Sequence, residues 1–135
     1  MTRSQKIAFQ VLFCFYVAAV LVLCFAHFEQ TPAIEWSLWG IPSDKIVHFC
    51  MFLPFPILAF LAFDRYTDSV RSTLLFSGIT LLVGFLLAWG TEWGQAHLTD
   101  YRSGDPLDLL ADGTALVLST LLVIFLDIRK QKKCL

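Results

Sequence analysis

Four long apolar runs dominate this chain and restrict what it can fold into. They cover about residues 7–28, 46–63, 74–93 and 107–128, and each is close to the roughly 20 residues that cross a bilayer as a helix. Only 16% of the residues are charged, whereas a soluble domain carries about 25%. The sequence therefore predicts an all-α integral membrane protein, a four-helix bundle in a single domain over residues 1–135. It excludes a soluble enzyme with a large core of its own.

The charge balance of the chain excludes one class of partners. Ten Lys and Arg residues face eleven Asp and Glu residues, so the net charge is −1 and there is no global basic field for nucleic acid. The basic run at residues 129–133 is short and follows the last apolar run, which is typical of a headgroup anchor. We therefore expect membrane lipids as partners, and no nucleic acid. Oligomerisation of the bundle stays open.

The basic residues outside the apolar runs predict the orientation of the bundle. Two precede the first run, two lie between the second and third runs, and four follow the last run, whereas the two remaining loops hold one each. Because cytoplasmic loops are enriched in Lys and Arg, both termini are expected in the cytoplasm. The first run is expected to remain as a span, because it is long for a signal peptide and no small-x-small cleavage site follows it.

Polar residues stand at the predicted outer ends of the second and third spans. Helical spacing would place Asp44 and His48 one turn apart on one face, with Ser43 as the N-cap of that helix. Glu92 and Gln95, three residues apart at the end of the third span, would likewise share a face. Two prolines in the second span, Pro54 and Pro56, are expected to kink its helix.

The fourth span begins with a row of acidic residues. Asp105 is followed by proline, a pair typical of an N-cap and a first helical position, and Asp108 would lie in the first turn. Asp112 would lie about 10 Å into the span, at roughly 1.5 Å per residue. A carboxylate at that depth costs at least about 2.5 kcal/mol, so Asp112 should face the bundle and find a partner. The cationic candidates are Lys45, His48 and Arg102.

These polar residues are predicted to form one cluster at one membrane level. Ionisable residues within membrane spans mark functional sites by default. The alternative is that they pair with one another and hold the bundle together. Helix capping is sufficient to explain Asp44 and Asp105, whereas Glu92, Arg102, Asp108 and Asp112 together favour a function. The predicted functional cluster comprises Asp44, Lys45, His48, Glu92, Gln95, Arg102, Asp108 and Asp112.

The order of these polar motifs resembles that of the VanZ-like family of small bacterial membrane proteins. Two positions depart from the family pattern: Asp112 stands where Asn is frequent, and Ala115 stands where glycine is usual. The motifs that carry the resemblance are Asp44-Lys45-x-x-His48-Phe49, Glu92-x-x-Gln95, and Arg102 followed by Asp108-x-x-Ala111-Asp112.

The resemblance implies a location and a physiological setting. Members are multi-pass proteins of the bacterial inner (cytoplasmic) membrane, so a role in the cell envelope is implied. The name-giving members confer low-level antibiotic resistance to teicoplanin, a lipoglycopeptide that binds cell-wall precursors. An effect on lipoglycopeptide susceptibility is therefore an expectation for this chain.

The residues themselves support a first hypothesis of lipid binding without a cofactor. Arg102 offers a forked donor and Lys45 a point charge, which suit the phosphate of an anionic lipid or a lipid-linked wall precursor. The nearby carboxylates of Glu92, Asp108 and Asp112 would orient Arg102 or accept hydrogen bonds from headgroup donors.

Two other functions stay open at this point, and with them the question of whether the chain is an enzyme. In a membrane-embedded hydrolase or transferase acting on a lipid headgroup, Glu92, Asp108 and Asp112 would hold a divalent cation and His48 would act as general base. A transporter is disfavoured, because the ionisable residues gather at one boundary and the inner halves of the third and fourth spans are expected to be apolar.

Overall fold

Helices make up almost all of the described chain, which comprises residues 2–26, 37–63, 68–100 and 104–133 of a computed structural model. In chain order the elements are α1 (Arg3–Phe25), β1 (Ser37–Leu38), β2 (Ile41–Pro42), α2 (Ser43–Phe52), α3 (Pro54–Phe63), α4 (Val70–Leu98) and α5 (Pro106–Lys133).

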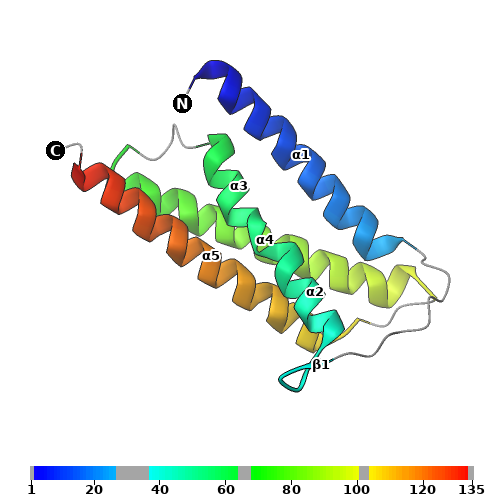
Figure 1. Cartoon of the computed structure of the whole chain (residues 1–135). Helices are drawn as coiled ribbons and strands as arrows, with labels where there is room; N and C mark the ends of the chain where they lie inside the picture. The colour runs from blue at the N-terminus through cyan, green and yellow to red at the C-terminus, as the bar shows by residue number, and fades with distance from the viewer. Residues whose placement is uncertain (1, 27–36, 64–67, 101–103, 134–135) are drawn as a thin grey trace.

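Four helical stretches are long and apolar enough to cross a membrane, namely α1, α2 together with α3, α4, and α5. This confirms the predicted all-α class and identifies a multi-pass membrane protein. The start of α1 and the end of α5 lie at the same end of the bundle, whereas the start of α2 lies at the other end (Figure 1). An even number of spans produces this arrangement.

The predicted break in the second span occurs at its prolines. Pro54 has no N–H, so the helix is divided there into α2 and α3. The hydroxyl of Tyr16 on α1 donates a hydrogen bond to the carbonyl of Met51, at a distance of 2.5 Å. The rings of Phe13 and Tyr16 also lie 5.4 and 6.4 Å from that of Phe55. The first helix therefore covers the break and accounts for part of the polar backbone exposed there.

The longest two helices, α4 and α5, form the central pair of the bundle. A Cβ atom added at Gly84 of α4 would lie 2.7 Å from a methyl group of Leu116 on α5, so glycine is what allows this close approach. Leu116, Ala88 and Phe52 are fully buried around the contact. Helix α2 packs mainly against α5, and α3 packs against α1 and α5.

The helix ends differ from the predicted span limits because local capping, rather than hydropathy, determines them. The side chain of Ser69 accepts a hydrogen bond from the Ser72 backbone and so starts α4 four residues before the predicted span. At α2, however, the expected N-cap Ser43 is wrong. The N-cap is Pro42, which makes no side-chain capping bond, because the β1–β2 hairpin runs directly into the helix.

The halves of the third and fourth spans that were expected to be the inner ones are not apolar, which corrects the expectation from the sequence. Polar side chains on α4 and α5 face one another there, and Thr73 donates to the carboxylate of Asp127 at 2.6 Å. Gln131 donates to the same oxygen at 2.9 Å. These polar side chains continue the polar residues along α4 and α5, so an apolar inner half no longer disfavours a transporter. The buried polar residues of this inner seam are Thr73, Ser77, Thr80, Ser119, Thr120 and Asp127.

Candidate functional site

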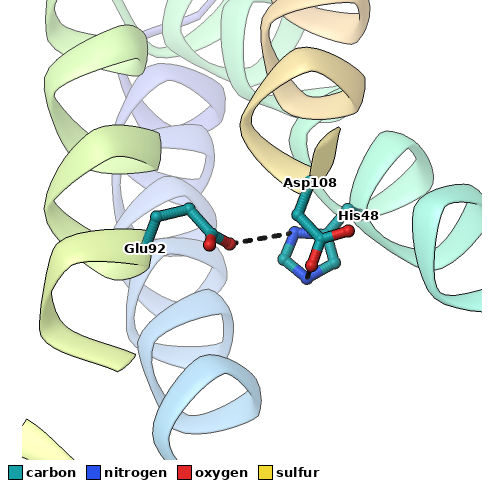
Figure 2. Close-up of side chains that lie close together, drawn as sticks. All are labelled: His48, Glu92 and Asp108. Carbon is teal, nitrogen blue, oxygen red and sulfur yellow. Dashed lines mark ion pairs between the residues drawn. The ribbon is translucent and has the colours of Figure 1, made fainter. Parts of the chain in front are cut away.

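Three helices bring their ionisable residues together at the end of the bundle where α2 and α5 begin. Figure 2 shows His48 of α2, Glu92 of α4 and Asp108 of α5 pointing toward one another. His48, which lies 44 positions before Glu92 and 60 before Asp108, therefore meets both of them in one place. We call this group the polar cluster; its described members are Asp44, Lys45, His48, Glu92, Asp105, Asp108 and Asp112.

Lys45 lies among three carboxylates. Its Nζ atom is 2.9 Å from Asp44, 2.5 Å from Asp105 and 2.5 Å from Asp108, and 11% of its side chain is exposed. The hydrogen bond from this ammonium group lowers the pKa of Asp105 below its usual value. The positive charge of Lys45 is therefore already balanced by carboxylates, and an anionic headgroup would have to compete with them for the ammonium group.

His48 is buried and lies against Asp112. Its Nδ1 is 3.1 Å from Oδ1 of Asp112, which is completely buried. This confirms that Asp112 faces the interior of the bundle and has a partner there. The other ring nitrogen, Nε2, lies 3.6 Å from Oδ2 of Asp108.

Glu92 contributes one bonded and one unbonded carboxylate oxygen. Its Oε2 accepts a hydrogen bond from the backbone N–H of Asp105 at 2.9 Å. Its Oε1 is buried, lies 3.9 Å from Nδ1 of His48, and has no hydrogen-bond partner among the described residues. A Cβ atom added at Gly104 would lie 2.9 Å from the Glu92 carbonyl oxygen, so glycine allows this segment to approach α4. The unbonded oxygen points at a ligand-binding role.

The start of α5 follows the sequence prediction closely. Asp105 accepts a hydrogen bond from the backbone N–H of Leu107 at 2.9 Å, as an N-cap does, and Pro106 is the first helical residue. Asp108 lies in the first turn, where the helix dipole favours a negative charge. Asp105 has a second role that capping alone did not indicate, because it also pairs with Lys45.

Two predicted members are not placed in the cluster. Gln95 is buried, but its Nε2 donates to the carbonyl of Cys24 on α1 at 2.8 Å, so it joins α4 to α1 instead. Arg102 lies outside the described residues. Asp44 stands at the rim, with 57% of its side chain exposed.

The polar cluster carries an excess of negative charge. Within the described chain, five carboxylates face one ammonium group and one imidazole. Two triplets of possible metal ligands result, and in each the ligand atoms lie within 4.8 Å of one another. The triplet Asp44, Asp105 and Asp108 surrounds the Lys45 ammonium group, whereas in the triplet His48, Glu92 and Asp108 the ammonium group pairs with Asp108 alone.

An apolar groove runs along the bundle beside the polar cluster. It lies between α2 and α5, has a volume of about 530 Å³, and includes Lys45 in its lining. Phe49 of α2 and Leu110 and Ala111 of α5 form apolar parts of its walls. A long hydrocarbon chain in this groove would therefore have its polar end next to the cluster.

Comparison with known proteins adds no identification. No model of a protein family, no curated protein and no solved structure matches this chain. The resemblance to the VanZ-like family therefore stays a prediction.

Proposed function

We propose that this chain is a VanZ-like multi-pass protein of the bacterial inner membrane that binds a phosphate-bearing lipid or a lipid-linked wall precursor. The observation that carries the proposal is the groove of about 530 Å³ between α2 and α5, which has Lys45 of the polar cluster in its lining. An amphipathic ligand needs an apolar path and a polar end in this relation. The hydrocarbon chain would lie in the groove and the headgroup would lie on the cluster.

The convergence of the three motif segments supports the same proposal. His48, Glu92 and Asp108 come from different helices, and each is at least nine-tenths buried. Burying several ionisable groups near a membrane boundary is costly, and such groups typically mark a binding site or pathway. With both termini in the cytoplasm, as the positive-inside rule predicts, the cluster would face the outer leaflet and the cell wall.

A wall precursor as ligand would connect the site to lipoglycopeptide susceptibility. A protein that sequesters or presents the precursor changes how much of it a drug such as teicoplanin can reach. Deleting the gene should then shift the inhibitory concentration of teicoplanin, and re-expression of the wild-type chain should restore it. The same shift with the Ala111→Phe variant described next would place the effect in the groove.

Native mass spectrometry of the chain extracted gently from its own membranes tests the lipid proposal directly. Ala111→Phe fills the groove between α2 and α5 and should abolish the co-purifying lipid. Ala18→Phe makes the same change in a groove of about 370 Å³ on α1 and should leave the lipid bound. Equal lipid occupancy in the two folded variants would refute the proposal. Arg102→Leu should also reduce occupancy if that side chain supplies a headgroup contact.

A second candidate function is a metal-dependent hydrolase or transferase acting on the headgroup. It is favoured by the triplet His48, Glu92 and Asp108, which joins one imidazole to two carboxylates beside the groove. The test is release of phosphate from phosphorylated lipids in vesicles with Mg²⁺ or Mn²⁺. Turnover that is lost in Glu92→Gln would establish the activity, and lack of release by the wild-type chain would exclude it for those lipids.

A further inference from the structure

One carboxylate oxygen of the polar cluster, Oε1 of Glu92, accepts no hydrogen bond from any group of the described chain. Glu92 is 7% exposed, and its Oε1 is buried without a hydrogen-bond partner in the described part of the chain. A buried carboxylate oxygen without a partner retains the desolvation cost of its burial, and this cost is larger for a charged group. Figure 2 shows that the Glu92 carboxylate is directed at the space beside His48 and Asp108.

Protonation of His48 does not supply the missing hydrogen-bond donor to Oε1 of Glu92. An imidazolium has two N–H groups, and its Nδ1 faces Asp112 at 3.1 Å. Its Nε2 faces Asp108 at 3.6 Å. Neither N–H is within hydrogen-bonding distance of Glu92, whose Oε1 is 3.9 Å from Nδ1. One cation that contacts all three side chains at once would satisfy the geometry better.

We infer that His48, Glu92 and Asp108 form a binding site for a first-row divalent cation such as Zn²⁺ or Mn²⁺. Their ligand atoms lie within 4.8 Å of one another. Bonds of about 2.0–2.2 Å would place neighbouring ligand atoms roughly 3.0–3.5 Å apart, so small rotations of the two carboxylates complete the site. Imidazole suits Zn²⁺ and carboxylates suit Mn²⁺, so a set of one imidazole and two carboxylates accommodates both ions.

Asp112 acts as the positioning residue for this site. It lies against Nδ1 of His48 and is completely buried, so it holds the ring and leaves Nε2 for the ion. Carboxylates in this position orient metal-bound histidines in many proteins, and removing them weakens metal binding by about 10–100-fold.

The cation also explains how an acidic cluster could accept a phosphate, a role that rests on the proposed lipid-binding function. Divalent ions held by one or two carboxylates commonly complete their coordination with substrate phosphates. The ion would supply the positive charge that Lys45, surrounded by carboxylates, does not offer. The metal site itself does not depend on the lipid, so the two ideas are tested separately.

The test is metal binding by the full chain, purified in detergent micelles, stripped with EDTA and titrated with Zn²⁺ alone or Mn²⁺ alone. Bound metal is measured by elemental mass spectrometry after desalting, and Mn²⁺ also by electron paramagnetic resonance. We expect about one ion per chain. Affinity should fall at least about tenfold in Glu92→Gln and Asp108→Asn, and by about 10–100-fold in Asp112→Asn.

A matched control comes from the other end of the same helix. Asp127 is also a buried carboxylate of α5, so Asp127→Asn should bind the ion like the wild-type chain. Because a cluster variant could misfold, the wild-type chain supplies a second readout: the spin-echo spectrum of bound Mn²⁺ should show a coordinated nitrogen from His48. Failure of the stripped wild-type chain to bind one ion, or equal affinity in Glu92→Gln, or a spectrum without coordinated nitrogen would overturn the inference.

The lipid measurements separate this inference from the proposed function. Metal binding that is lost in Glu92→Gln, together with lipid occupancy that Ala111→Phe does not change, would support the cation site and refute the lipid proposal. Lipid that remains bound after EDTA treatment to a chain that takes up no ion would refute the cation site and leave lipid binding standing.

Discussion

The contact between Gly84 and Leu116 makes the packing of α4 against α5 testable with one methyl group. In Gly84→Ala the new Cβ would lie 2.7 Å from one Leu116 methyl carbon and 3.2 Å from the other. Leu116 is completely buried, so its side chain relieves the overlap only by moving against packed neighbours. Overpacking of this kind costs about 1–3 kcal/mol. Alanine also favours a helix over glycine by about 0.8–1.0 kcal/mol, so the net loss of stability should be about 0–2 kcal/mol.

Two other glycines of the same helix give the matched controls. A Cβ atom at Gly78 or Gly90 would meet nothing within 4 Å among the described residues. Gly78→Ala and Gly90→Ala should therefore gain up to about 1 kcal/mol from helix propensity alone. Unfolding with sodium dodecyl sulfate in mixed micelles, followed by circular dichroism, measures all three variants. The difference between Gly84→Ala and the controls isolates the overpacking cost.

A double variant tests the assigned cause. In the background Leu116→Ala, which itself should cost about 2–5 kcal/mol, the methyl group at position 84 loses its shortest contact, and its penalty should shrink to the part caused by Phe55, whose ring carbon would lie 3.2 Å away. Equal stability of Gly84→Ala and Gly78→Ala, or an unchanged penalty in the Leu116→Ala background, would refute the packing argument.

Three further changes test single contacts, each by the same unfolding titration. Thr73→Val removes a donor to buried Asp127 and should cost about 1–3 kcal/mol. The control Thr114→Val removes an exposed hydroxyl that donates to a carbonyl of its own helix, and it should cost little. Tyr16→Phe removes the bond at the proline break and should cost about 0.5–1.5 kcal/mol; an unchanged midpoint would show that the break needs no cover. Because the pKa of Asp105 is lowered from its ordinary value of 3.8, its stabilising pairing is complete above that pH and is lost as the pH falls further. Asp105→Asn should lack this acid-dependent loss.

The helices and one buried pair could be predicted from the sequence because they depend on local or strongly constrained features. Apolar runs identify spans without knowledge of the partner helices. Asp112 lies deep in a span, where the cost of an unpaired charge leaves few alternatives to an interior partner, and His48 provides that partner. The Asp105-proline start of α5 follows from capping chemistry alone.

The other assignments depend on which helices become neighbours, and periodicity does not contain that information. Gln95 lies only three residues from Glu92, yet it faces α1, whose position around α4 could not be predicted. The three carboxylates around Lys45 come from α2, the segment before α5 and α5 itself. The balancing of the Lys45 charge could therefore also not be predicted without the fold.

The residues of the inner seam, in contrast, follow a pattern that the sequence contains, but averaging the hydropathy over a whole span hides that pattern. Thr73, Ser77 and Thr80 follow the spacing of one helix face, and Asp127 lies in the last part of α5. Mean hydropathy over a whole span does not register such a row, because the lipid-facing residues outnumber it.

Asp108 and Asp127, two of the three buried acidic residues of α5, also relate the bundle to the thickness of its bilayer. Asp108 and Asp127 are 19 positions apart, which corresponds to about 28 Å along a helix. The hydrocarbon core of a typical bilayer is about 30 Å thick. A hydrocarbon core of this thickness, centred on α5, would have one of these carboxylates near each edge, with the apolar contact of Gly84 and Leu116 between them. A thicker membrane would draw both ends away from water or be thinned around the bundle, whereas a thinner membrane would tilt the bundle, so hydrophobic mismatch acts directly on access to the polar cluster.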